Sequence, residues 1–355
     1  MLRSLRAMDF RCFDALGIEV PEAGAVFTGQ NAQGKTSVLE AVCVLVRLHS
    51  PRTSRMQTLA RIGGHGGFGI AGEAWDMERR IDWRPRVPTR HVVEGDERPS
   101  QGGYLEDGGL LVWMGNDDLD LVRGGGESRR RYLDFMGSQV APDYRRALAR
   151  YRRALKAKNL LLKDGERRRR EIESYEAIMI PAAEVLRRVR ADLSGRLTEV
   201  VAERQRTIAG KDELAGMSYL PGGGMELGPA LEQVREKEFR QRRSLVGPHR
   251  DELELTVNGM PAAAYASEGQ QRTLALALKL AQGGVLRERA GREPVWLIDD
   301  VFGELDVSRR NALMRALPTG AQKWITTTYL DWLKETPELE GLARFAVEGG
   351  SLRAS

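Results

Sequence analysis

The stretch Gly29-Gln30-Asn31-Ala32-Gln33-Gly34-Lys35-Thr36 matches the phosphate-binding pattern G-x-x-x-x-G-K-[ST] at every fixed position. It follows the apolar run AVFTG and precedes KTSVLEAVCVLVRL, whose apolar residues recur at helical spacing. A strand, a glycine-bounded loop and a helix in this order turn backbone N–H groups and a helix N-terminus toward phosphate oxygens. The predicted ATP-binding residues are Gly29, Gln30, Asn31, Ala32, Gln33, Gly34, Lys35, Thr36 and Ser37.

Two acidic residues supply the second half of a nucleotide site. Lys35 is expected to reach the β- and γ-phosphates, and the Thr36 hydroxyl to ligate Mg²⁺. The apolar run VWLI ends in Asp299 and Asp300; alone, it is equally typical of an ordinary strand end. Beside a phosphate loop, it predicts that Asp299 holds the Mg²⁺ site and that Asp300 is the catalytic residue that polarises the attacking water.

Strand signals occur at both ends of the chain. Residues 1–30 are predicted to form short strands, and residues 63–113 mix glycine-rich turns with β-like runs that indicate an antiparallel sheet. Strand signals return after Gly222-Gly223-Gly224 in ELELTVNG, EPVWLIDDV and KWITTTY. The α/β character of the first third therefore resumes in the last third.

The middle of the chain is predicted to be helical, with little strand signal between about 127 and 243. One helical face carries apolar residues at three- and four-residue steps: Tyr144, Leu148, Tyr151 and Leu155. A second helical stretch covers 166–209, and Pro181 is expected to kink or break it. The arginine run 167–170 is interpreted as a solvated helix face, with a DNA contact as the alternative.

The order of the motifs selects a branch of the P-loop proteins. Lys35 and Asp299 are 264 residues apart, and the turn SEGQQR begins 32 residues before Asp299. Phosphate loop, helical insertion, Ser-x-Gly-Gln turn and acidic strand follow the plan of an ABC-type P-loop ATPase head. We therefore expect an α/β head with a mixed sheet and an antiparallel β region, formed by 1–126 and 244–355, with an inserted helical lobe at 127–243.

Composition gives only weak information about the partners and the location of the protein. The chain has 55 basic and 50 acidic residues, and its net charge of +5 favours polyanionic partners, although a GC-rich genome would produce the same arginine bias. Two cysteines cannot form a disulfide framework, and neither lies in a metal-ligand spacing. No 18-residue apolar run occurs, so we expect a cytoplasmic protein without a membrane span.

At this point the chain resembles the RecF family, bacterial recombination-mediator ATPases related to the heads of SMC and Rad50 proteins. The resemblance covers most of the sequence and is weakest in the helical insertion. It rests on the segments DFRCF, TGQNAQGKTSVLEAV, DDLDLVRGGGESRRRYLD, LVGPHRDELEL, ASEGQQRTLALALKLA, VWLIDDVFGELDVSRR and ITTT.

The resemblance implies that ATP and Mg²⁺ join two copies of the chain. Ser267, Gly269 and Gln270 would form a signature motif that contacts ATP bound to the partner copy, and Asp306 of Glu304-Leu305-Asp306 would belong to the D-loop. The run Thr326 to Thr328 would occupy the switch position, with a plain strand end as the alternative. Arg11 resembles a nucleotide-contacting arginine, and a surface charge is equally plausible.

Three features depart from the family pattern. Glu268 places a negative charge inside the signature motif, Gly303 replaces a small hydroxyl residue, and MGNDDL replaces a proline-bearing segment. These departures put the detailed geometry of the interface in doubt.

The resemblance also implies function and partners: an ATP-dependent, DNA-binding recombination mediator, with slow and DNA-stimulated ATP hydrolysis. Expected partners are double-stranded DNA, RecR-like and RecO-like mediators and a RecA-type recombinase loaded at single-strand gaps. Arg129, Arg130 and Arg131 could contact DNA phosphates without reading bases. The alternatives are an ATPase subunit coupled to a membrane transporter and a regulatory clamp that binds ATP without useful turnover.

Overall fold

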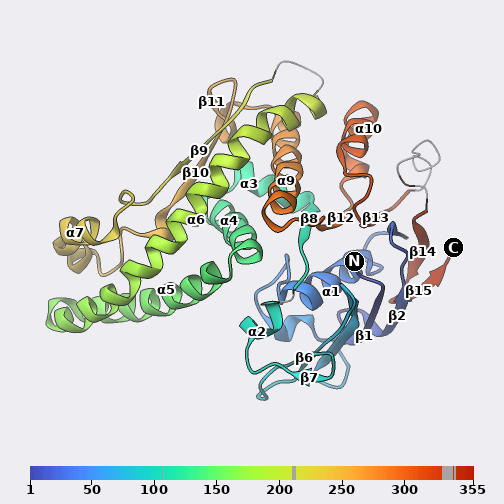
Figure 1. Cartoon of the computed structure of the whole chain (residues 1–355), viewed down its shortest axis with the longest axis horizontal. Coiled ribbons are helices and arrows are strands. Elements are labelled where there is room, and N and C mark those ends of the chain that lie inside the picture. Colours follow the sequence, from blue (N-terminus) through green and yellow to red (C-terminus); the bar gives the residue numbers. More distant parts are fainter. Residues whose placement is uncertain (107, 210–212, 330–338, 340) are drawn as a thin grey trace. The chain divides into compact units, whose positions relative to one another are not determined.

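The computed structural model describes residues 1–106, 108–209, 213–329, 339 and 341–355 (Figure 1). It divides into two compact units, one formed by 1–118 with 286–355 and the other by 119–285. The predicted insertion 127–243 lies within the range of the second unit. No helix in the described part of the chain is long and apolar enough to cross a membrane.

The sheet that carries the phosphate loop is mixed. Its five parallel strands stand in the order β14, β3, β13, β12 and β8, and β15 pairs antiparallel with β14 at one edge. The strands are β3 (Gly24–Thr28), β8 (Leu111–Gly115), β12 (Val295–Asp299), β13 (Lys323–Thr327), β14 (Ala343–Glu348) and β15 (Ser351–Ala354). Because β3, β12 and β13 are adjacent and parallel, the phosphate loop and the acidic pair follow the same sheet edge.

The first unit also holds the predicted antiparallel sheet. Its strand order is β2, β1, β4, β5, β6 and β7. The strands are β1 (Ser4–Phe10), β2 (Phe13–Glu19), β4 (Phe68–Ala74), β5 (Met77–Trp83), β6 (Arg90–Val93) and β7 (Asp96–Glu97). The antiparallel region expected within 63–113 is confirmed, although 101–106 forms a short helix that the sequence pattern does not predict.

Helix α1 begins at Lys35, directly after the phosphate loop, and is buried almost all round. Its mostly apolar surface from Val38 to Val46 suits this position, because the helix packs inside the unit and most of its faces are buried. The other helices whose ranges lie wholly or mostly in this unit are η1 (Met56–Leu59), α2 (Gln101–Glu106), η2 (Asn116–Leu119), η5 (Phe302–Glu304) and α10 (Val307–Ala316).

The second unit is mainly helical, as the sequence predicts. Tyr144 and Tyr151 of α5 pack with Met179 and Leu186 of α6 and Leu231 of α7 in one apolar core, so the predicted face of α5 is buried. Figure 1 shows α5 lying along the first part of α6. The helices are α3 (Asp120–Arg123), α4 (Gly126–Val140), α5 (Pro142–Leu161), η3 (Leu162–Arg168), α6 (Arg169–Ala209), α7 (Leu227–Gln241), η4 (Pro248–Arg250), α8 (Ala262–Tyr265) and α9 (Glu268–Ala290).

Two details of the helical region differ from the sequence-based expectation. Strand β9 (Ala215–Leu220) lies inside the stretch expected to lack strands, because it pairs with β10 (Glu252–Val257), which also pairs with β11 (Met260–Pro261). Helix α6 continues through Pro181, so the helix is not broken there, and of the predicted kink or break the break is wrong. The missing donor of one proline is offset by the packing of α6 against its neighbours over many turns.

Candidate functional site

The phosphate loop joins the buried strand β3 to helix α1. Its two glycines take left-handed backbone conformations, with φ of 153° at Gly29 and 110° at Gly34. A side chain at Gly34 would start 2.5 Å from the Cys12 sulfur, and one at Gly29 would collide with the Val347 carbonyl. The loop is therefore tight enough to require glycine at both fixed positions, and its backbone N–H groups keep the concave arrangement that phosphates need.

Lys35 lies back over the loop. Its ammonium donates to the carbonyls of Gly29, at 2.6 Å, and Gln30, at 3.0 Å. Burial lowers the pKa of Lys35, while the carboxylates of Asp300 and Asp299 act in the opposite direction. Two carbonyls of the loop thus hold the Lys35 ammonium at the loop. A cation in this position is suited to bind a phosphate.

The first acidic residue lies between two threonines. Asp299 Oδ1 accepts the hydroxyl of Thr36 at 2.8 Å and the hydroxyl of Thr326 at 2.7 Å. Burial raises the pKa of Asp299, against these two hydrogen bonds, which favour its ionised form. Thr36 and Asp299, the two predicted Mg²⁺ residues, are therefore in direct contact, although they are 263 residues apart in the sequence.

Asp300 has an unusual backbone conformation and an unpaired oxygen. Its φ of 52° lies in the left-handed region, which aspartate tolerates better than most residues, and its N–H donates to Thr326 Oγ1 at 2.9 Å. Within the described residues, its Oδ1 is buried and has no hydrogen-bond partner. Burial raises the pKa of Asp300, and the charge of Lys35 opposes this shift. Such a carboxylate is suited to accept a proton.

These residues fit ATP and Mg²⁺ by their chemistry. The loop has no room for side chains at Gly29 and Gly34, and the buried Oδ1 of Asp300 has no hydrogen-bond partner in the described part of the chain. The described residues contain no group of three or more His, Cys, Asp or Glu side chains that could hold a metal alone. A magnesium ion bound through Thr36, Asp299 and substrate phosphates needs no such group.

The other predicted residues of the loop form its backbone turn or connect the loop to neighbouring elements. Gln33 Oε1 accepts the N–H of Gly349 at 2.6 Å, which ties the loop to the turn between β14 and β15. Asn31 and Ala32 form the turn itself, and Ser37 lies buried in the first turn of α1. The sequence gives no signal for the C-terminal hairpin as a wall of the loop.

Arg11 is not a loose surface charge. Its guanidinium makes two hydrogen bonds to the buried carboxylate of Glu40, at 2.6 and 2.7 Å, and a third to the Thr58 carbonyl. Only 19% of its side chain is exposed. The surface-charge alternative for Arg11 is therefore wrong, while a nucleotide contact stays a prediction.

Among the residues after the acidic pair, one caps a helix and another bonds to a distant segment of the same unit. Asp306, the predicted D-loop residue, caps helix α10 by accepting the N–H of Arg309 at 2.9 Å. Glu304 Oε1 accepts the side-chain amide of Asn116, in the segment MGNDDL, at 2.8 Å. At the predicted switch position, Thr326 donates its hydroxyl to Asp299.

The predicted signature motif forms a capping box at the start of α9. The Ser267 hydroxyl accepts the N–H of Gln270 at 3.3 Å, and Gln270 Oε1 accepts the N–H of Ser267 at 2.9 Å. The Thr273 hydroxyl donates to the Gly269 carbonyl. Helix α9 therefore begins with its first donors partly satisfied by its own side chains, at the end where an anion would bind.

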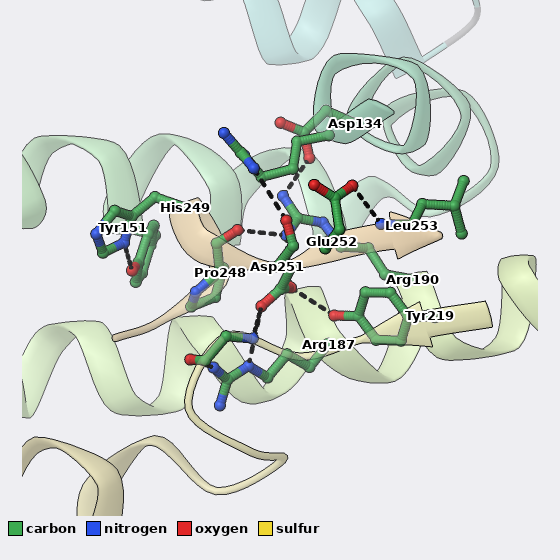
Figure 2. Close-up of polar contacts among 12 residues, drawn as sticks. Asp134, Tyr151, Arg187, Arg190, Tyr219, Pro248, His249, Asp251, Glu252 and Leu253 are labelled. Carbon is green, nitrogen blue, oxygen red and sulfur yellow. Dashed lines mark hydrogen bonds and ion pairs between the residues drawn. The ribbon is translucent and has the colours of Figure 1, made fainter. Parts of the chain in front are cut away.

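The segment LVGPHRDELEL ties the helical unit together (Figure 2). Asp251 accepts hydrogen bonds from Arg190 at 2.7 Å, from the N–H of Gly222 at 2.8 Å and from Tyr219. Arg190 also donates to Asp134 at 2.8 Å. The described network is buried, so these charges act as internal ties among α4, α6, β9 and β10.

The three predicted DNA arginines have different settings. Arg129 makes two hydrogen bonds to Glu252 and two to backbone carbonyls, and 14% of its side chain is exposed. Arg130 donates to the Asp251 carbonyl, and burial lowers its pKa. Arg131 pairs with Glu127 and has 72% of its side chain exposed. Of the three, Arg131 alone presents most of its side chain to solvent.

Comparisons with known proteins decide the family. No family model matches the chain. It is 35% identical over 380 residues to the DNA replication and repair protein RecF of Synechococcus sp. (strain JA-2-3B'a(2-13)), covering 99% of this chain and 97% of the relative. The same protein of Shouchella clausii (strain KSM-K16) is 30% identical over 373 residues, with 99% of both chains covered. The chain belongs to the RecF family.

Solved structures agree with the RecF assignment. The recombination mediator protein RecF-ATPrS of the RecFOR pathway matches with a TM-score of 0.87 and 26% identity, over 100% of this chain and 98% of that one. The RecF-ATP form gives the same TM-score and identity. An Smc head domain from Pyrococcus furiosus shares the fold, with a TM-score of 0.57 and 15% identity, over 100% of this chain and 95% of that one.

Family membership confirms several expectations. The chain is a RecF recombination mediator of DNA replication and repair, in an ATP-binding family, with the mixed α/β fold of RecF and SMC heads. The alternative of a transporter-coupled ATPase is thereby wrong.

Proposed function

We propose that this RecF chain binds and hydrolyses ATP with Mg²⁺, and that ATP drives two copies of the chain together. The observation that carries the proposal is the buried oxygen of Asp300, which has no hydrogen-bond partner among the residues that the structure describes and is next in sequence to the Asp299 that contacts Thr36. Structural groups of this kind are normally satisfied in a folded protein, and an orphan suggests a ligand or a catalytic role.

Each residue of the loop has a place in the proposed reaction. The backbone of Gly29 to Ser37 and the Lys35 ammonium would hold the phosphates, and Thr36 with Asp299 would hold Mg²⁺, which neutralises phosphate charge when bound. Asp300 would take a proton from the attacking water. The oxygen of that water would bond to the γ-phosphorus while the bond from the γ-phosphorus to the β,γ-bridging oxygen breaks, and ADP would leave with that oxygen. The Thr326 hydroxyl would keep Asp299 and the backbone of Asp300 in register with each other.

We propose that the second half of each ATP site comes from the signature motif of another copy. Ser267 directly precedes the 23-residue helix α9, and Gly269 and Gln270 lie in its first turn, where the positive end of the helix favours an anion. A bound γ-phosphate would replace the internal cap that Ser267 and Gln270 provide. Two equivalent sites follow if the pair has two-fold symmetry, and loss of the γ-phosphate would loosen it.

Double-stranded DNA is the proposed polyanionic partner, and helix α5 offers a basic face for it. We define the α5 basic face as Arg146, Arg150, Arg153 and Lys156, all exposed and opposite the buried side of the helix. Arg146 pairs with Asp143 at 2.5 Å. Within the described residues, Arg150, Arg153 and Lys156 have no acidic partner, so they are free to neutralise phosphates. Arg131 stays a proposed contact, whereas Arg129 is committed to Glu252.

The relatives of the RecFOR pathway suggest the remaining partners. We propose that RecO-like and RecR-like mediators act with this chain and that together they help load a RecA-type recombinase at single-strand gaps. This part of the proposal rests on family membership and the printed pathway of the RecF structure.

One experiment tests the core of the proposal. ATP hydrolysis is measured with and without double-stranded DNA, and sedimentation gives the mass in the same nucleotide states. We expect an ATP-dependent shift from monomer to dimer and DNA-stimulated turnover. Lys35→Met should lose nucleotide binding, and Ser267→Arg should bind ATP yet stay monomeric. A wild-type protein whose mass is the same with and without ATP would contradict the proposed dimer.

A further inference from the structure

Glu268 places a negative charge at the proposed dimer contact, where a phosphate is expected to bind. It follows Ser267 directly, and an unpaired carboxylate there would repel the γ-phosphate that Ser267 is proposed to contact. In the structure, Arg123 Nη2 lies 3.1 Å from Glu268 Oε1, and Arg272 Nη2 lies 3.3 Å from the same oxygen. The hydrogen bond from Arg123, more than that from Arg272, lowers the pKa of Glu268. The charge is therefore paired within its own chain.

Arg123 also holds the next residue of the motif. Its Nε donates to Gln271 Oε1 at 2.9 Å. The amide nitrogen of Gln271 donates in turn to the carbonyls of Ala262, at 3.1 Å, and Ala266, at 3.0 Å. The buried side chain of Gln271 therefore links Arg123, at the end of α3, to the carbonyls of α8 and of the residue that follows it, and holds the first turn of α9 in place.

The rest of GQQR completes the arrangement. Gln270 caps the helix with Ser267, Gln271 fixes the preceding turn, and Arg272 supplies the weaker of the two counter-charges to Glu268. In this motif, Glu268 is the one residue whose charge opposes an incoming phosphate. Its chief compensating partner, Arg123, is 145 positions earlier in the sequence.

We propose that Arg123 is a positioning residue of the proposed ATP-dependent dimer: it neutralises Glu268 so that the Ser267 turn can accept the γ-phosphate of ATP held by a second copy. This inference rests on the proposed function. It assigns a role outside the phosphate loop and the acidic pair. Because both charges lie at the surface, the effect is electrostatic and is weakened by salt.

The test measures ATP-driven dimerisation of the full chain by sedimentation at low and high salt. We expect Arg123→Ala to weaken the dimer about tenfold at low salt, the size expected when two exposed charge contacts, one at each site, turn repulsive. The loss should shrink at high salt. Adding Glu268→Gln to Arg123→Ala should restore most of the affinity, because no carboxylate is then left to neutralise.

The controls separate charge from structure. Arg123→Lys keeps a cation and should keep most of the dimer, and Glu268→Gln alone should dimerise at least as tightly as the wild type. If the double variant stays as weak as Arg123→Ala, Arg123 acts through Gln271 as a structural tie, and the inference is overturned. Normal dimerisation of Arg123→Ala also overturns it and leaves the proposed function intact, whereas a monomeric wild type with ATP overturns both.

Discussion

Thr326 donates its hydroxyl to Asp299 at 2.7 Å, and the same oxygen accepts the N–H of Asp300 at 2.9 Å. One buried hydroxyl thereby joins the proposed Mg²⁺ carboxylate to the backbone of the proposed base. The register of the sheet makes this possible, because Asp299 on β12 stands opposite Thr326 on β13. Thr326 thus connects the two residues of the acidic pair.

Thr326→Val should slow ATP hydrolysis and leave nucleotide binding largely intact. Valine has nearly the shape of threonine, so the change removes the two hydrogen bonds and little packing. Hydrogen bonds to charged groups contribute about 1.5–3 kcal/mol, so turnover should fall roughly ten- to hundredfold. Thr328→Val is the matched control, and single-turnover ATP hydrolysis is the measurement. Equal rates of hydrolysis for the two variants would show that the Thr326 hydroxyl has no special role in the reaction.

Asp300→Asn should trap the ATP-bound dimer. Asparagine tolerates the left-handed backbone of position 300 but cannot accept the proton, so hydrolysis should fall about 10²–10⁴-fold while ATP still binds. The wild-type rate should also fall with decreasing pH, because the base works ionised and burial raises its pKa above that of an ordinary aspartate. A pH–rate profile checks this. Normal turnover in Asp300→Asn would mean that another group is the base.

The sequence predicts those parts of the site that depend on local backbone chemistry. The loop glycines, Lys35, Thr36 and the acidic pair are recognisable because their spacing follows from phosphate geometry and from the end of a buried strand. Thr326 could be placed only as one of three threonines, because choosing among them needs the register between β12 and β13.

Contacts between distant segments could not be predicted in the same way. The pairing of Arg123 with Glu268, the bond from Gly349 to Gln33 and the pairing of β9 with β10 each join residues that no local pattern relates. Arg129 shows a different limit of reasoning from sequence. A run of arginines indicates solvent exposure, but Arg129, the first arginine of the run, is paired with Glu252.

Gly34→Ala should weaken ATP binding about tenfold or more. The new methyl group would start 2.5 Å from the Cys12 sulfur, in a backbone conformation with φ of 110° that alanine rarely adopts. Such strain costs on the order of 1–3 kcal/mol, and relief requires the loop to move. Gly17→Ala is the control, because nothing lies near its added methyl. An ATP titration with unchanged affinity in Gly34→Ala would contradict the geometry of the loop.

Arg190→Met should destabilise the helical unit strongly. The substitution leaves Asp134 and Asp251 without their shared cation, and 3% or less of the Arg190 and Asp251 side chains is exposed. Removing one partner of a buried ion pair costs about 3–5 kcal/mol of unfolding free energy. Urea denaturation compares this variant with Arg188→Met, which changes an exposed arginine on the same helix. A loss below about 1 kcal/mol would show that the network contributes little.

Replacing Arg150, Arg153 and Lys156 together by glutamine should weaken binding of double-stranded DNA and reduce its salt dependence. Each phosphate contact contributes about −0.9 to the slope of log K against log salt, so the slope should become shallower by up to about 3. The control replaces Arg168, Arg169 and Arg196, which pair with acids on the same unit, and changes the net charge equally. Equal losses in both variants would point to net charge alone. A loss confined to the first variant assigns DNA binding to the α5 basic face, because Arg150, Arg153 and Lys156 have no carboxylate partner in the described part of the chain to give up before they meet a phosphate.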